Sequence, residues 1–371
     1  MKAPIKVMTI FGTRPEAIKM APIILKMKQM PEKFQPVVLV TGQHRQMLQQ
    51  VLDVFHIVPD CNLKIMQKNQ TLSQITVRVI SKLDRILSIH RPDIILVHGD
   101  TTTTFAAAIS AFYHKIPLGH VEAGLRTWDK YSPYPEEMNR QLTDTLADLY
   151  FSPTKLSRSN LILEHHDARH IYVTGNTAID ALHQTVDPNY HHAVLDQINS
   201  RHRIILLTMH RRENQGLPMR RTFQVINQEL KKHPDVEVIY PVHLSPRVRK
   251  VAHQEFDRSQ RVHLIQPLDV VDFHNLAAKS TFIMTDSGGV QEEAPSLGKP
   301  VLVLRDRTER PEGVKAGTLK LVGTDPQRVR AGMEMMLDDP EAYHRMSAAK
   351  NPYGDGRASE RILRVIDKEF S

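Results

Sequence analysis

Two carboxylates follow closely on apolar strands in the first half of this 371-residue chain. Asp100 ends the run "DIILVHGD" and Glu122 lies in "LGHVEAG". One expected helix joins these strands, so a right-handed crossover would bring both carboxylates to one rim of a parallel sheet. Such a pair suits proton transfer, because one carboxyl group can be protonated while the other is charged. Capping of the next helix is the alternative role for Asp100 and the four threonines after it.

Glycines and basic residues at other strand ends are typical of an anion site. "TDSGGVQEEAPSLGKPVLVL" (285–304) predicts a strand, a small loop and a helix whose first amides could bind a phosphate. "FGTRPE" (11–16) and "TMHRRE" (208–213) place Arg14 and His210 at comparable strand ends. Each segment could also be only a capped or solvated helix start. No G-x-G-x-x-G pattern follows the first strand, so a dinucleotide cofactor is not expected.

Composition sets the broad class. A net charge of +8 favours anionic partners, either nucleic acid or a phosphorylated small molecule. The basic residues are scattered and no nucleic-acid-binding motif is present, so nucleic acid is the outside alternative. A single cysteine, Cys61, excludes an internal disulfide framework and most cysteine metal sites. No apolar run is long enough for a membrane span and no signal peptide is recognisable, which predicts a cytoplasmic protein.

The elements that must position these residues alternate between strands and helices. Six nearly continuous apolar runs precede residue 185, and six more follow a polar stretch at 185–202, which we interpret as a linker with a short helix. Runs of this kind suit parallel strands covered on both faces. We therefore expect an α/β protein of two doubly wound, Rossmann-like domains, 1–180 and 181–356, with a helix at 357–371 that returns to the first. Ligands of such sheets bind beyond the carboxyl ends of the strands.

The assembled motifs resemble the non-hydrolysing bacterial UDP-N-acetylglucosamine 2-epimerases. The matching segments span residues 11–356 and include "FGTRPEAIKMAP", "HGDTTTT", "GHVEAGLRT", "SPYPEEMNR", "HRREN" and "TDSGGVQEEAPSLGKPVLVLRDRTERPE". The resemblance implies a glycosyltransferase-B-like fold with the active site in a central cleft. It implies reversible conversion of UDP-N-acetylglucosamine to UDP-N-acetylmannosamine in cell-envelope polysaccharide synthesis, by a homodimer that needs neither nicotinamide nor metal.

The resemblance also assigns roles to residues. Catalysis falls to Asp100, Glu122, Glu136 and His210. Substrate binding falls to Arg14, Lys19, Leu268, Phe273, Ser287, Gly288, Gly289, Glu293 and Arg310. A second, activating nucleotide-sugar site would use Gln43, Gln46, Gln70, Arg211 and His243, together with Glu136. Two alternatives use the same nucleotide site: a glycosyltransferase, which would need an acceptor, and a non-catalytic nucleotide-sugar sensor, which would not exchange protons.

Overall fold

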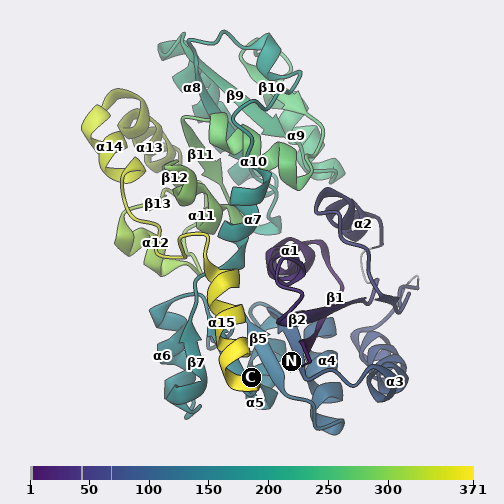
Figure 1. Cartoon of the computed structure of the whole chain (residues 1–371). Helices are drawn as coiled ribbons and strands as arrows, with labels where there is room; N and C mark the ends of the chain where they lie inside the picture. The colour runs from purple at the N-terminus through teal and green to yellow at the C-terminus, as the bar shows by residue number, and fades with distance from the viewer. Residues whose placement is uncertain (1–2, 43–44, 68) are drawn as a thin grey trace. The chain divides into compact units, whose positions relative to one another are not determined.

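The computed structural model describes residues 3–42, 45–67 and 69–371 (Figure 1). The chain divides into two compact units. The first unit is Met1–Gln184 with Tyr353–Ser371, and the second is Thr185–Pro352. The C-terminal segment thus belongs to the first unit, where the last helix, α15 (Ala358–Phe370), contacts the first helix, α1 (Arg14–Lys28).

The first unit is built on a seven-stranded parallel sheet of order β3-β2-β1-β4-β5-β6-β7. Its order reverses direction between β1 and β4, the point at which doubly wound sheets bind ligands. The strands are β1 (Ile5–Phe11), β2 (Phe34–Val40), β3 (Cys61–Asn62), β4 (Ile94–His98), β5 (Leu118–Val121), β6 (Leu149–Ser152) and β7 (Ile171–Val173).

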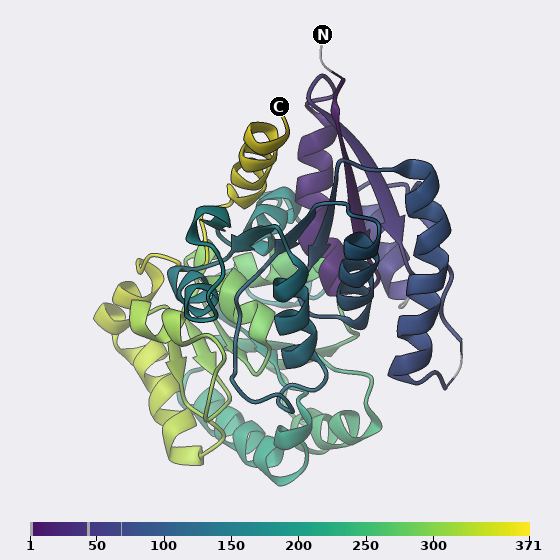
Figure 2. The same cartoon turned by 90° about the horizontal axis from the view of Figure 1, so that it is seen from below.

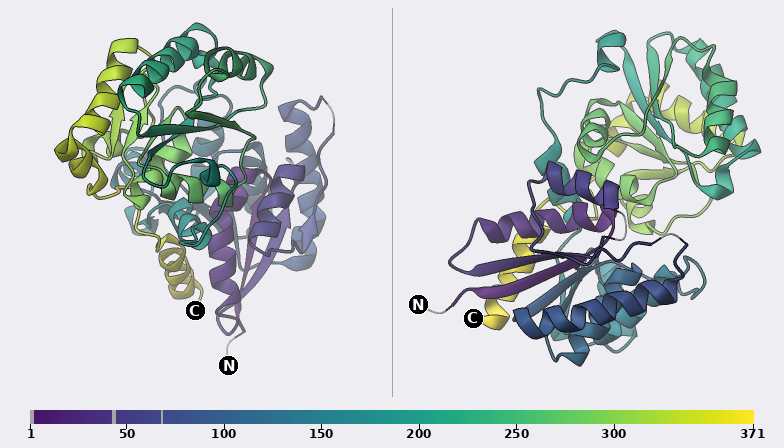
Figure 3. Two further views of the ribbon diagram at one scale, coloured as in Figure 1. Left: turned by 90° about the horizontal axis from the view of Figure 1, so that it is seen from above. Right: turned by 90° about the vertical axis from the view of Figure 1, so that its right-hand side faces the viewer.

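Helices cover both faces of this sheet. Two views show α1 and α3 (Leu72–His90) on opposite sides of β1 and β2 (Figures 2 and 3). The helix α2 (Arg45–Val54) contacts α1, whereas α4 (Thr102–Tyr113) contacts both α3 and α5 (Glu136–Leu146). The remaining helices of this part are α6 (Lys155–Leu163), a short 3-10 turn η1 (Ala168–His170) and α7 (Thr177–Thr185).

The second unit repeats the plan with a six-stranded parallel sheet of order β10-β9-β8-β11-β12-β13. Its strands are β8 (Arg203–Thr208), β9 (Val236–Pro241), β10 (Val262–Ile265), β11 (Phe282–Thr285), β12 (Val301–Val303) and β13 (Leu319–Leu321). Its helices are η2 (Leu195–Gln197), η3 (Arg212–Asn214), α8 (Leu217–Lys232), α9 (Pro246–Phe256), α10 (Val270–Lys279), α11 (Gly288–Glu293), η4 (Ala294–Leu297), α12 (Pro311–Ala316), α13 (Pro326–Asp338) and α14 (Pro340–Ser347).

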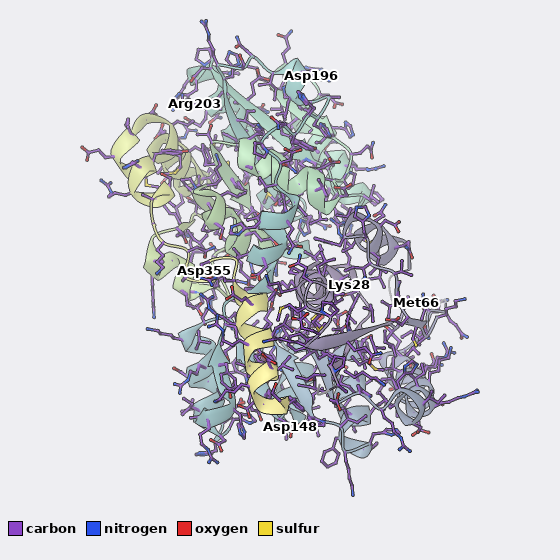
Figure 4. The ribbon with its side chains drawn as sticks, viewed as in Figure 1. Lys28, Met66, Asp148, Asp196, Arg203 and Asp355 are labelled. Atoms are coloured by element: carbon purple, nitrogen blue, oxygen red, sulfur yellow. The ribbon has the colours of Figure 1, made fainter. Side chains whose placement is uncertain are left out.

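Strand β8 shows why the apolar runs are continuous. Ile205 and Leu207 enter the hydrophobic cluster on one face of the sheet, while Ile204 and Leu206 enter the cluster on the other. Both faces are therefore buried, as parallel sheets require. Arg203, labelled in Figure 4, begins the strand, and its Nε lies 2.7 Å from Asp235, the residue before β9.

The structure corrects three details of the predicted elements. The first sheet has a seventh strand, β3, whose two residues are too short to give a periodic pattern. Strands β4 and β5 end two and three residues before the apolar runs "DIILVHGD" and "LGHVEAG" do, because the final residues of each run turn away from the sheet. The segment after α7 holds only the 3-10 turn η2 instead of a short α-helix.

Candidate active site

Asp100 and Glu122 follow neighbouring parallel strands. The register of β4 and β5 pairs His98 with Val121, so the residues after both strands emerge at one end of the sheet. Glu122 was expected inside the strand, but β5 ends at Val121 and Glu122 adopts a left-handed backbone conformation with φ of 69°. Such a conformation is uncommon for residues other than glycine and costs about 1–3 kcal/mol, which marks a constrained position.

Three donors hold one oxygen of the Glu122 carboxylate. Its Oε2 accepts hydrogen bonds from the Lys19 ammonium, from His98 Nε2 at 3.1 Å and from Asn176 Nδ2 at 3.2 Å. Within the described residues, Oε1 accepts none. The carboxylate is thus oriented through Oε2.

The charge on Glu122 follows from the same contacts. Burial by itself would raise the pKa of this carboxyl group, because the ionised form loses its hydration. The positive charge of Lys19 and the contact with His98 outweigh burial and hold the pKa of Glu122 well below its usual value. Glu122 is therefore ionised, which suits a residue that first accepts a proton.

Asp100 is held from α5. Arg140 donates from its guanidinium to Asp100 Oδ2 at 2.6 Å, and Asn139 Nδ2 donates to the Asp100 backbone oxygen at 2.9 Å. The Asp100 side chain is 28% exposed, against 9% for that of Glu122. The two carboxylates thus occupy different environments, and this separation is what lets a pair divide acid and base roles.

The threonine run after Asp100 has a structural use. Thr101 caps α4 by accepting a hydrogen bond from the Thr104 amide at 3.1 Å. The hydroxyl groups of Thr101 and Thr104 lie 2.7 and 3.0 Å from Oε1 of Glu16, which is buried at the start of α1. The other oxygen of Glu16 accepts the amides of Gly12 and Thr13. The hydrogen bonds of Glu16 therefore connect the loop after β1 to the loop after β4.

The backbone amides of the loop after β1 donate hydrogen bonds within the protein. Because Gly12 and Thr13 donate to Glu16, the backbone just before Arg14 is already satisfied. Arg14 begins α1 with a partly buried side chain, and Lys19 lies just over one turn later on the same helix. The ammonium of Lys19 lies beside Glu122 and so links α1 directly to this carboxylate.

Helix α5 begins with two glutamates of different surroundings. Glu136 is partly exposed at the first position. Glu137 is fully buried, and its carboxylate accepts the backbone amides of Thr127 and Trp128 at 3.1 Å. The segment "PEEMNR" is therefore more than a charged helix start, since its buried members brace a loop and its arginine pairs with Asp100.

In the second unit, Asp286 organises the strand ends. Its Oδ2 accepts the backbone amides of His210 and Arg211, both at 2.9 Å, and Asn214 Nδ2 at 3.0 Å. Its Oδ1 lies 3.4 Å from His210 Nδ1. Asp286 is fully buried, whereas the His210 side chain is 41% exposed. A buried carboxylate thus lies beside an accessible imidazole at the end of β8.

Ser287 is the N-cap of α11, Gly288 and Gly289 are its first two residues, and the Arg310 guanidinium lies beside Gly288. A Cβ atom at Gly288 would lie 3.0 Å from the Arg310 guanidinium carbon, so only glycine leaves this space without displacing the arginine. Arg310 donates to Glu292 at 2.8 Å and to Glu309 at 2.7 Å. A guanidinium beside a helix start is suited to a phosphate group.

The other expected binding residues lie around this turn. Glu293 ends α11 and its Oε2 lies 3.4 Å from His274 Nε2. Phe273 and Leu268 are partly buried against the hydrophobic cluster that contains Ile204 and Leu206 of β8. The Phe273 ring centre lies 6.4 Å from that of His274. These residues come from the β10–α10 region and from α11, which the fold brings together.

The expected activator residues are spread over both units. Arg211 donates to the Asp286 backbone oxygen at 2.9 Å, and the ring of His243 stacks on that of His210 at 5.4 Å between centres. Burial, followed by the charge of His210, lowers the pKa of His243. Gln70, in the first unit, donates to the Ile65 oxygen at 2.9 Å. Gln43 and the side chain of Gln46 lie outside the described residues.

Several residues of the two rims were not predicted from the sequence. Each of them contacts a residue that was predicted. His98 and Asn176 contact Glu122, Arg140 contacts Asp100, and Asp286 contacts His210. The only available signal was position, because His98, Asp286 and Asn176 all lie at or just after strand ends.

Two further observations concern cofactors and membranes. In residues 3–42, 45–67 and 69–371, no group of three histidine, cysteine, aspartate or glutamate side chains is arranged to hold a metal ion. Over the same residues, every helix is too short or too polar to cross a bilayer.

Known proteins share both the sequence and this architecture. The family described as UDP-N-acetylglucosamine 2-epimerase matches residues 26–367. The UDP-N-acetylglucosamine 2-epimerase of Bacillus subtilis is 61% identical over 98% of this chain and 95% of its own length. A solved structure of a putative UDP-N-acetylglucosamine 2-epimerase from Listeria monocytogenes superposes with a TM-score of 0.95, at 53% identity over 99% of this chain and 97% of that one.

Two more solved structures share this architecture. The Neisseria meningitidis UDP-GlcNAc 2-epimerase, solved with UDP-GlcNAc bound, has a TM-score of 0.89 at 48% identity, over 98% of this chain and all of that one. A glycotransferase of kitacinnamycin covers the full chain with a TM-score of 0.70 at 10% identity, which shows the fold alone. The predicted glycosyltransferase-B-like class of two parallel α/β sheets is therefore confirmed. By sequence and by structure, the chain belongs to the UDP-N-acetylglucosamine 2-epimerase family.

Proposed function

We propose that this enzyme interconverts UDP-N-acetylglucosamine and UDP-N-acetylmannosamine by elimination and re-addition of UDP. The observation that carries the proposal is Glu122, a buried carboxylate that Lys19 keeps ionised and that is oriented through Oε2. It follows β5, the strand paired with β4, and Asp100 lies two residues after the end of β4. The reaction removes a proton from one face of the sugar and adds a proton to the opposite face. Two carboxylates in different surroundings suit these two proton transfers.

The chemistry requires the leaving group. No carbonyl adjacent to carbon 2 of the sugar ring can hold the charge left when its proton is removed. The C–H electron pair must instead form a double bond to carbon 1 as the bond from carbon 1 to the UDP oxygen breaks, with UDP leaving as an anion. The reverse step adds a proton to carbon 2 on the opposite face and UDP oxygen to carbon 1. Stabilising the departing diphosphate is therefore part of catalysis.

The second unit is suited to that stabilisation. We assign the diphosphate to the turn at Ser287–Gly289, the Arg310 guanidinium on Gly288 and His210 with its partner Asp286. Phe273 and Leu268 are assigned to the base, and Glu293 to hydroxyl groups of the sugar. Arg14 and Lys19 are assigned to the substrate as well.

The decisive experiment follows the purified enzyme with UDP-N-acetylglucosamine alone in heavy water by proton NMR. We expect UDP-N-acetylmannosamine carrying deuterium at carbon 2. Glu122→Gln and Asp100→Asn should each lower kcat by about a hundred- to ten-thousand-fold while still binding UDP, with Glu136 as the reserve acid/base group. Product that retains its original hydrogen would refute two-carboxylate transfer. Turnover only with an added acceptor would support a glycosyltransferase, and binding without exchange a sensor.

Four finer features belong to the same proposal: a cytoplasmic enzyme, a homodimer, a role in cell-envelope polysaccharide synthesis, and activation by a second UDP-N-acetylglucosamine. The stacked pair His210 and His243, with Arg211 beside it, supports the last feature, since an activator there would touch a catalytic histidine. The reverse reaction should then start only when a trace of UDP-N-acetylglucosamine is added. Full-rate reversal from UDP-N-acetylmannosamine alone would refute the activator site.

A further inference from the structure

A completely buried histidine lies behind the two carboxylates. His120 is on β5 and has no exposed surface. Its Nδ1 lies 2.6 Å from Asp144 Oδ1 on α5, and its Nε2 lies 2.8 Å from the backbone oxygen of Gly99. Both ring nitrogens therefore face atoms that only accept hydrogen bonds, provided that Asp144 is ionised.

The surroundings of Asp144 keep it ionised. Burial alone would raise the pKa of Asp144, but His120 and Arg126 outweigh burial and lower it. Its second oxygen accepts a charge-assisted hydrogen bond from Arg126 at 2.7 Å and the Gly124 amide at 3.3 Å. Arg126 also donates to Glu164 at 2.7 Å. An ionised carboxylate and a carbonyl oxygen cannot donate, so both contacts are hydrogen bonds only when each nitrogen of His120 carries a hydrogen.

These hydrogen bonds converge on the backbone of both catalytic loops. Gly99 immediately precedes Asp100 and has φ of 68°, and Gly124 follows Glu122 by two residues with φ of 86°. Left-handed glycines have wide conformational freedom, so their carbonyl and amide groups need an external anchor to keep one orientation. His120 anchors the first loop to Asp144, and Asp144 anchors the second directly.

We propose that His120 and Asp144 form a positioning pair that sets the separation and orientation of Asp100 and Glu122. The inference rests on the proposed function, because it assigns these two carboxylates to the chemistry. A buried ion pair generally adds little net stability over apolar residues of similar volume. The His120–Asp144 pair instead fixes geometry. A doubly protonated ring holds the Gly99 carbonyl and the Asp144 carboxylate on opposite sides at defined positions.

Two substitutions separate the anchors. The amide nitrogen of glutamine reaches roughly the place of Nε2, so His120→Gln keeps a donor to Gly99 and loses the bond to Asp144. The shorter asparagine places its nitrogen near Nδ1, so His120→Asn keeps Asp144 and loses Gly99. Both variants remove the same buried charge and ring, so each is the matched control for the other.

We expect His120→Asn to lower kcat by about a hundredfold with KM changed by less than a few-fold, because a loop displaced by about 1 Å costs this much in rate. His120→Gln should recover part of that loss, because it keeps the donor to Gly99 but not the bond to Asp144. Amide hydrogen exchange at Gly99 and Asp100 should be faster in the asparagine variant than in the glutamine variant. Equal kcat losses, or equal exchange rates, would overturn the positioning role.

Nitrogen-15 NMR of the wild type, labelled at histidine, tests the protonation state itself. The signals lost in both variants should belong to a ring with hydrogen on each nitrogen. A bare nitrogen would overturn the proposal. Neither NMR nor hydrogen exchange depends on turnover, so a wild type without epimerase activity would refute the proposed function while these readouts still decide whether His120 anchors the loop.

Discussion

Lys19→Met removes the main positive charge beside the Glu122 carboxylate and leaves the burial of Glu122 unchanged. The side chains of Lys19 and Glu122 are 12% and 9% exposed, so the pair is largely desolvated. Removing one partner of such a pair costs about 3–5 kcal/mol. The donors His98 and Asn176 remain, so we expect the lower end, about 3 kcal/mol, which for a unit of this size lowers Tm by about 6–12 °C.

The loss should depend on pH in a defined direction. In the wild type the pKa of Glu122 is depressed, so its stabilising contribution is present above the ordinary glutamate pKa and is lost as pH falls through the depressed value. Without Lys19, burial is the largest influence and raises the pKa. Ionised Glu122 then destabilises the folded protein at neutral pH, and protonation relieves the penalty, so the deficit should be larger at pH 8 than at pH 5.5.

The assay is differential scanning calorimetry at both pH values. Lys33→Met is the matched control, because Lys33 pairs with Asp367 at 2.6 Å on the surface, where water screens the charges. It should change Tm little at either pH, and Lys19→Arg should retain most of the wild-type Tm. A deficit for Lys19→Met that is no larger than the control, or that does not shrink at pH 5.5, would refute the electrostatic account of Glu122.

Three further changes test other parts of the structure. Gly288→Pro removes an amide and crowds the Arg310 guanidinium, so UDP affinity measured by calorimetry should fall at least tenfold; wild-type affinity would contradict the assignment of this turn. Arg126→Met leaves Asp144 and Glu164 without their buried guanidinium and should cost about 3–5 kcal/mol in denaturant unfolding; a cost below 1 kcal/mol would mean that water replaces the pair. Asp180→Ala removes the carboxylate that accepts the Ala358 and Ser359 amides at the start of α15, so this helix should lose about 1 kcal/mol and show faster amide exchange; unchanged exchange would exclude the cap.

The sequence by itself determined the architecture and the rim of each sheet. Continuous apolar runs such as 203–208 predict strands buried on both faces, and alternation with helices requires parallel sheets, since a parallel connection needs a crossover. Polar residues that interrupt these runs, such as Asp100 and His210, had to emerge at the carboxyl ends. Long motif stretches were specific enough to indicate the family, and the comparisons confirm it.

Only the tertiary structure decided how the rim residues are paired. Lys19 and Glu122 are 103 positions apart, His210 and Asp286 are 76 apart, and Arg140 and Asp100 are 40 apart. Each contact depends on strand register and on where a helix docks, and periodicity along the chain encodes neither. The ionisation state of Glu122 also depends on the tertiary structure. Its burial and its cationic partners act in opposite directions, so the outcome exists only once both are placed around one carboxylate.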